Sequence, residues 1–231
     1  MSDPIFSVAS EFPEVNFTAS GGADVLDKAT DNVETWTYDS TEVGYLTGFI
    51  AGTSGISPLA VVESLDLPFV TATDDGFRLG VAATNPEAEI LPSVFVGSFD
   101  DAQAASQATN SLISQGAKLV FTTGDGIGAG VASGADEGGA FTMGVSLSAG
   151  AIAEKVNIAT VDLDLYPQYA QWIEDITSDS FGNEGNTSSI ANGGVIASAV
   201  NPVNDELSDI DAQLAELVAG LSDGSISLSG N

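Results

Sequence analysis

The stretch VGSFDDAQAASQATNSLISQGAKLVFTTGDGIGAGV, residues 96–131, contains the alternation that decides the fold. Its first part predicts a helix over 98–115, which opens with two aspartates where carboxylates favour the helix dipole. An apolar strand over 118–122, a glycine-rich turn and a helix of small residues over 128–137 follow. Helices that alternate with short apolar strands are typical of parallel sheets covered on both faces, the α/β class.

The same alternation extends over most of the chain. The region 178–202, rich in Ser, Asn and Gly, predicts a long irregular connection. Asn204 is expected to cap an amphipathic helix, and 222–231 to end in a strand. The remaining expected elements are strands over 15–19, 33–38, 59–62, 90–96, 141–145 and 158–163, and helices over 5–12, from Ser40, 70–83 and 167–177.

The composition excludes several classes of function. The 231 residues include 33 Asp or Glu, 4 Lys or Arg, and no His or Cys, for a formal net charge of -29. Binding to nucleic acid or to an anionic membrane needs clustered basic residues, so neither partner is expected. A zinc site, a Ser-His-Asp triad or a Cys-His pair needs His or Cys, so no cofactor, metal or catalytic residue is predicted. An enzyme using Asp74 or Asp125 is the minor alternative.

The excess of acid also indicates the environment of the protein. Such a chain repels itself in dilute buffer, whereas concentrated salt reduces the screening length to a few ångströms. We therefore expect a halophilic protein, with an ordinary acidic secreted protein as the alternative. No run approaches the ~20 apolar residues of a membrane span, and residues 1–15 lack the features of a signal peptide or a lipidated Cys.

The turn GDGIGAG, residues 124–130, follows a predicted strand and opens a predicted helix. At such a position an α/β sheet presents backbone N–H groups to an anionic or polar ligand. The turn matches neither GxGxxG nor a P-loop, and the alternative is a tight turn with close helix packing. Five aromatic residues are expected in the core rather than on a ligand: Trp36, Tyr38, Tyr166, Tyr169 and Trp172.

Five segments, in order along the chain, carry a resemblance to a known family. They are YDSTEVGYLTGFIAG (38–52), DDGFRLGVAATNPEAEI (74–90), residues 96–121, GIGAGV (126–131) and GLSDGSISL (220–228). Together they closely resemble the basic membrane protein family, the PnrA-like solute-binding proteins of ABC transporters. The resemblance implies a type I periplasmic-binding-protein fold whose two lobes close on a small ligand, often a purine nucleoside.

The resemblance also implies a division of the chain. Residues 1–40 would be the remnant of an incomplete N-terminal lobe, and 41–158 most of the C-terminal lobe. Residues 159–231 would form the hinge crossovers and a return segment with a C-terminal helix. Because the family normally begins with further strand–helix units, we hypothesise a truncated reading frame or a fragment.

The positions that contact the ligand in the family differ here. The family's GVDxDQ becomes GVSLSA, so the Asp that holds ribose hydroxyls is replaced by Ser146, and the expected Lys falls near Asp162. Charged hydrogen bonds contribute about 1.5–3 kcal/mol each, so these changes predict weaker nucleoside binding. The candidate ligand-binding residues are Thr73, Phe77, Thr123, Gly126, Gly128, Ser146 and Asp162.

The function implied is that of a solute-binding component of an ABC importer, without catalysis. Its partners would be a small polar solute, nucleoside-like by resemblance, and permease subunits, with a homo-oligomer left open. The full-length protein would act at the extracellular face of the cell membrane. The alternative is a truncated interaction or regulatory module, or an inactive remnant, that does not transport.

Overall fold

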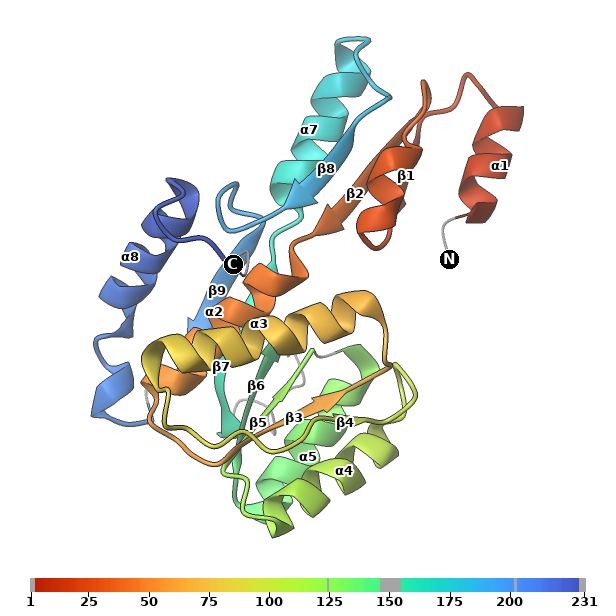
Figure 1. Ribbon diagram of the computed structural model, residues 1–231. Coiled ribbons are helices and arrows are strands. Elements are labelled where there is room, and N and C mark those ends of the chain that lie inside the picture. The colour runs from red at the N-terminus through yellow and green to blue at the C-terminus, as the bar shows by residue number, and fades with distance from the viewer. Residues whose placement is uncertain (1–2, 124, 146–154, 202, 229–231) are drawn as a thin grey trace. The chain divides into compact units, whose positions relative to one another are not determined.

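The computed structural model describes residues 3–123, 125–145, 155–201 and 203–228 (Figure 1). The chain forms two compact units, each made from two segments. Unit 1 combines Met1–Asp39 with Leu163–Val195, and unit 2 combines Ser40–Asp162 with Ile196–Asn231. The predicted α/β class is confirmed, while the division into 1–40, 41–158 and 159–231 stays a prediction.

Unit 1 is a three-stranded parallel sheet in the order β1-β2-β8. One face carries an apolar core formed by Ala9, Ala19, Val25 and Val33. The opposite face carries the alternate residues of β2 and β8, which are two aromatic and three polar residues: Glu34, Trp36, Tyr38, Asn186 and Ser188. The elements are α1 (Asp3–Glu11), β1 (Phe17–Ser20), the 3-10 helix η1 (Ala23–Lys28), β2 (Val33–Tyr38), α7 (Tyr166–Thr177) and β8 (Gly185–Ser188).

Unit 2 contains a six-stranded sheet in the order β4-β3-β5-β6-β7-β9. The five strands from β4 to β7 pair in parallel. Its strands are β3 (Leu59–Glu63), β4 (Val94–Phe95), β5 (Leu119–Thr122), β6 (Phe141–Val145), β7 (Asn157–Leu163) and β9 (Val195–Val200). Its helices are α2 (Ser40–Thr53), α3 (Pro68–Thr84), α4 (Ala102–Ser114), η2 (Asp125–Ile127), α5 (Gly128–Gly138), η3 (Asp205–Leu207) and α8 (Ile210–Ser222).

Both faces of the unit 2 sheet are buried, as the apolar strands predict. Alternate residues of β3 and β5, such as Val62 and Val120, pack against α4 and α5. On the other face the ring of Phe121 stacks on that of Phe77 in α3, with centroids 4.6 Å apart and planes 5° apart. The period of two along each strand therefore supplies apolar contacts to two helical layers.

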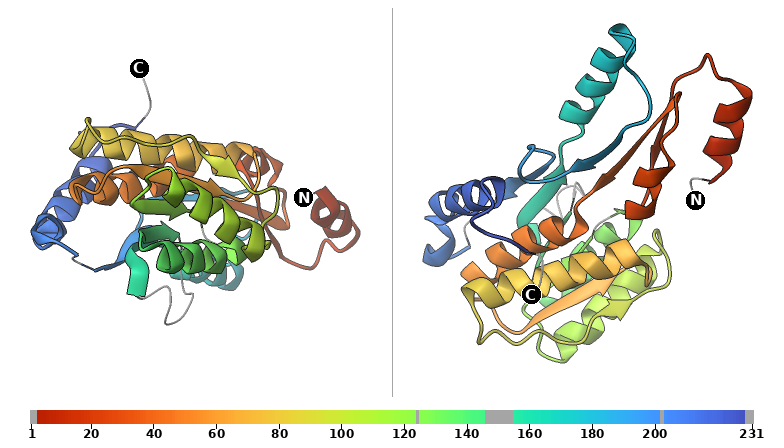
Figure 2. Two further views of the ribbon diagram at one scale, coloured as in Figure 1. Left: turned by 90° about the horizontal axis from the view of Figure 1, so that it is seen from below. Right: turned by 45° about the horizontal axis from the view of Figure 1, so that its top comes forward.

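Two pairs of helices in unit 2 pack through glycine. Gly44, Gly48 and Gly52 lie four residues apart on α2, and a Cβ on Gly48 would lie 2.0 Å from the carbonyl oxygen of Phe77 in α3. A Cβ on Gly130 of α5 would lie 2.0 Å from the carbonyl oxygen of Ala102 in α4. Within each pair the helices lie side by side in every view (Figures 1 and 2). Backbone therefore contacts backbone along both pairs.

Two elements have bounds in the structure that differ from those predicted from the sequence, the strand over 90–96 and the helix over 98–115. The strand expected over 90–96 is reduced to Val94–Phe95, since Pro92 lacks the N–H that a ladder requires. The sequence predicts Asp101 inside the first turn of a helix, whereas in the structure it precedes α4 as the N-cap. Its side chain accepts a hydrogen bond from the Ala104 N–H at 2.9 Å.

The expectation for the last third of the chain was partly wrong. The connection expected over 178–202 contains β8 and β9. Asn204 caps the short η3, whereas α8 begins only at Ile210. Residues 223–228 form no strand.

The prediction that the aromatic residues of α7 lie in the core is wrong for two of the three, whereas Trp172 is half-buried. Tyr166 and Tyr169, expected in the core, are 77% and 54% exposed. The same helix buries Asp175.

Candidate ligand-binding site

The strand order of unit 2 identifies one edge of its sheet as the place for a ligand. From β3 the chain proceeds outward to β4 and then crosses back to β5, on the other side of β3. The order therefore reverses between β3 and β5. In open parallel sheets, ligands bind outside the carboxyl ends of the strands at such a reversal.

A buried carboxylate lies at this point. Glu63 ends β3 and is fully buried, and the Thr123 hydroxyl, just after β5, donates to Glu63 Oε2 at 2.7 Å. Ser64 follows and is also buried, and its Oγ has no hydrogen-bond partner among the described residues. Sequence reasoning missed Glu63 and Ser64. The available signal was an acid directly after the apolar run 59–62 of a buried strand.

The glycine turn follows Thr123 directly. A Cβ on Gly126 would lie 2.7 Å from the Cα of Asp100, so a side chain there would displace the segment before α4. Gly128 is buried as the first residue of α5. The alternative of a tight turn with close packing is therefore supported by the contact at Gly126, and Thr123, Gly126 and Gly128 do lie together on one connection.

The other candidate residues lie in different surroundings. Thr73 and Phe77 are buried in α3, where the Thr73 hydroxyl donates to the Phe69 carbonyl at 3.0 Å. Asp162 is half-buried near the carboxyl end of β7, and Ser146 lies outside the described residues. Phe77 stacks on Phe121, two residues before Thr123, but no side-chain hydrogen bond links Thr73 or Phe77 to the described part of the glycine turn. Ligand contact by any of these residues stays a prediction.

Two hollows in the described residues lie away from Glu63 and Thr123. One of about 430 Å³ lies in unit 1 beside Phe6 and Asn183. Another of about 540 Å³ lies in unit 2 beside Tyr45 and Glu216. Neither includes Glu63 or Thr123 in its lining, so the strand order and not the size of a hollow identifies the edge.

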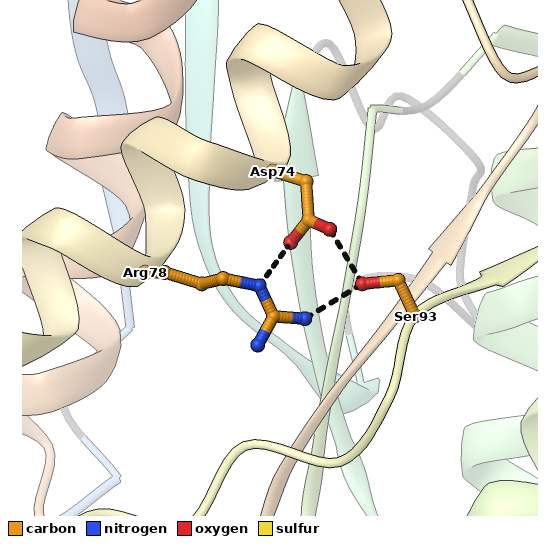
Figure 3. Close-up of polar contacts among 3 residues, drawn as sticks. All are labelled: Asp74, Arg78 and Ser93. Carbon is orange, nitrogen blue, oxygen red and sulfur yellow. Dashed lines mark hydrogen bonds and ion pairs between the residues drawn. The ribbon is translucent and has the colours of Figure 1, made fainter.

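A polar triad joins α3 to the segment before β4 (Figure 3). Asp74 Oδ1 accepts from Arg78 Nε at 3.1 Å, and Asp74 Oδ2 accepts from the Ser93 hydroxyl at 2.5 Å. A second Arg78 nitrogen donates to Ser93 Oγ at 2.7 Å. Both oxygens of Asp74 are thus engaged, which argues for a structural role and against the minor alternative of catalysis by this acid.

Replacement of Asp74 by alanine is expected to lower the free energy of unfolding by about 1–2 kcal/mol. The substitution leaves Ser93 and the partly exposed Arg78 without their acceptor. Chemical denaturation in concentrated KCl measures the change. Asp75→Ala is the matched control, since Asp75 is the exposed neighbour and its loss should change stability by less than about 0.5 kcal/mol. Equal effects of the two substitutions would contradict the structural role of the triad.

The fold and this edge define a class: an α/β binding protein of the periplasmic-binding-protein type. The family model for PnrA-like ABC transporter substrate-binding proteins matches residues 1–215. The chain belongs to this family, which binds solutes outside the cytoplasm for ABC import.

Solved structures agree with this assignment. A solute-binding protein of an ABC transporter system from Conexibacter woesei is 38% identical, with a TM-score of 0.85 over 98% of this chain and 75% of that chain. A solute-binding protein from Aeropyrum pernix, 18% identical, has a TM-score of 0.79 over 98% of this chain and 74% of that chain. A transcriptional activator of the comK gene from Bacillus halodurans, 15% identical, has the same TM-score over 98% and 77%. The last two likenesses concern the fold alone.

No helix in the described part of the chain is both long enough and apolar enough to cross a bilayer.

Proposed function

We propose that this chain binds a small polar solute, with a nucleoside as the first candidate, at the carboxyl edge of the unit 2 sheet. The solute would then pass to the permease subunits of an ABC importer at the extracellular face of the membrane. The observation that carries the proposal is the Glu63–Thr123 pair, which lies with the Gly126 turn where the strand order reverses.

The chemistry of this edge favours a ligand that donates hydrogen bonds. Glu63 supplies a carboxylate whose position is fixed by Thr123, and carboxylate acceptors form stronger hydrogen bonds than neutral ones. The hydroxyl of Ser64 and the backbone of the glycine turn supply neutral groups. Sugar hydroxyls and an exocyclic amine fit this set, which supports a nucleoside over an anionic solute.

A thermal-shift screen tests the proposal. The chain is unfolded in about 2–3 M KCl, where screening reduces the carboxylate repulsion, with nucleosides, nucleobases, sugars or small amines added. A ligand at 100 times its Kd stabilises the folded state by about 2.7 kcal/mol, so nucleosides are expected to raise Tm. Calorimetric titration of the strongest compound then measures its Kd.

Two other results of the screen would change the proposed function. A rise in Tm with sugars or amines alone would keep solute binding and replace the nucleoside. A cooperative transition that no compound shifts would contradict solute binding and favour the non-transporting module.

A transition temperature that rises with KCl in the absence of ligand would support the halophilic assignment.

A further inference from the structure

Helix α7 exposes the apolar side of an amphipathic pattern. Its exposed large side chains are Tyr166, Tyr169, Ile173 and Ile176. Tyr166 and Ile173, at 77% and 64%, are the most exposed large hydrophobic side chains among the described residues. A surface helix ordinarily buries its apolar stripe against its own domain. Helix α7 instead buries Asp175, which lies on the other side of the helix.

The spacing of the exposed side chains is that of a seam between two helices. They follow one another along α7 at intervals of three, four and three residues. Such intervals average 3.5 residues and place the side chains in one line, which packs into a second helix as knobs into holes. We call this line the α7 stripe: Tyr166, Tyr169, Ile173 and Ile176.

The described residues of unit 1 leave the α7 stripe uncovered. The helix runs beside β8 in each view (Figures 1 and 2), and the buried Asp175 shows that it packs through the side away from the stripe. On the outer side, the ring of Tyr169 meets the ring of Trp172 edge to face, with centroids 5.3 Å apart. This contact restrains Tyr169, so less side-chain entropy is lost when a partner packs on it.

The charges on α7 favour an uncharged partner surface. The net charge of the chain is -29, yet the helix positions beside the α7 stripe are neutral: Ala170, Trp172 and Thr177. The acids Glu174 and Asp175 lie off the stripe, and Asp175 is buried. A basic partner would be recognised by exposed acids around the seam, and α7 offers none there. A second copy of the chain presents the same neutral, apolar line.

The size of the α7 stripe indicates a weak dimer rather than a permanent one. A buried aromatic side chain covers about 150–250 Å². Four large side chains, each about half exposed or more, therefore present on the order of 500 Å² per copy. A stable interface buries about 800 Å² per partner. Because the neutral residues beside the stripe add to the contact, association in the micromolar range is expected.

We propose that two copies of this chain associate through their α7 stripes as an isologous dimer. A two-fold axis brings the same line of side chains from both copies together. Repulsion between two chains of charge -29 opposes the contact in dilute buffer, whereas concentrated salt shortens the screening length to a few ångströms. The dimer therefore forms in concentrated salt. It needs no solute, so its test is independent of solute binding.

Sedimentation equilibrium of the full chain in about 2 M KCl measures the association. The average mass is expected to rise from one chain toward two as the protein concentration passes through the micromolar range. In about 0.2 M KCl the dimer Kd should be at least tenfold higher, because repulsion is less screened.

Two results of sedimentation would overturn the proposal. The first is a chain that stays monomeric up to about 1 mM, which would leave a different polypeptide as the cover of the α7 stripe. The second is a dimer that weakens as KCl is raised, because ion pairs rather than an apolar seam would then hold it.

One substitution with a matched control separates the α7 stripe from general effects of charge. Ile173→Glu should raise the dimer Kd at least tenfold, because pairing would remove a carboxylate of each copy from water. Leu79→Glu adds the same charge at an exposed apolar position of α3 and should retain the Kd of the parent. Both positions are exposed, so both variants should fold, which thermal unfolding checks. Equal Kd values for the two variants would contradict the proposal.

Disulfide trapping locates the contact. The chain has no Cys, so one introduced Cys is its only thiol. The variants carry Cys at one position of the α7 stripe at a time, and Leu79→Cys is the control. Mild oxidation should link two copies through at least one stripe position, where the side chains of the two copies meet within disulfide reach. Linkage at no stripe position, or equal linkage of Leu79→Cys, would overturn the proposal.

Discussion

Gly48→Ala in α2 is expected to lower the free energy of unfolding by more than about 3 kcal/mol, at the upper end of overpacking. Two effects oppose each other at this position. Alanine favours the helix by about 1 kcal/mol over glycine. The new Cβ would lie 2.0 Å from the Phe77 carbonyl oxygen and 2.9 Å from its Cα, so α2 and α3 must separate. Backbone atoms cannot rotate away, and the steric cost therefore exceeds the gain in propensity.

Denaturant titration in concentrated KCl measures this loss. Ala215→Gly, at an exposed position of α8, isolates the propensity difference and should cost about 1 kcal/mol. A Gly48→Ala variant as stable as the parent would show that the helices separate at no cost. Since the stability of a domain is commonly about 5–15 kcal/mol, larger residues at Gly48 should prevent unit 2 from folding.

Thr123→Val is expected to lower stability by about 1.5–3 kcal/mol, because it removes a hydrogen bond to a buried carboxylate. It should also weaken solute binding at least tenfold, since Thr123 fixes the Glu63 side chain at the proposed site. Thr142→Val on β6 is the matched control: its buried hydroxyl donates to the neutral Val120 carbonyl at 2.9 Å. That variant should cost about 1 kcal/mol and leave solute affinity unchanged.

A double-mutant cycle tests the pair itself. Glu63→Gln keeps the shape of the side chain and removes its charge, so Thr123→Val should cost less in the Glu63→Gln background. Additive losses of stability would contradict coupling between the two side chains. Unchanged solute affinity in Thr123→Val would move the site away from this edge, even if the stability prediction is confirmed.

The elements that could be predicted from the sequence are those set by local pattern. The bounds of β2 and β6 agree with the predicted strands, because most residues of each are aromatic, apolar or β-branched. β8 reads GNTS and has no such pattern, so its conformation depends on pairing with β2, from Thr35 with Gly185 to Tyr38 with Ser188. That contact joins residues about 150 positions apart, which no local signal reports.

The candidate site also contains residues whose place could be predicted from local sequence and residues whose place could not. Thr123 and the glycine turn follow a strand and open a helix, so their place at a carboxyl edge could be predicted. Glu63 gains its importance from strand order, since only the crossover from β4 to β5 brings Thr123 beside it. The inward polar side of α7 could not be predicted either, because its spacing fits either orientation of an amphipathic helix.

The glycine-spaced helix pairs of unit 2 have a thermodynamic consequence. They bury peptide groups where other helix pairs bury aliphatic side chains. Exposure of apolar surface raises the heat capacity of the unfolded chain, whereas exposure of polar surface lowers it. Unfolding of this chain should therefore involve a smaller heat-capacity change than its length suggests. A smaller heat-capacity change flattens the curve of free energy against temperature, so the stability of unit 2 varies little between cold and warm conditions.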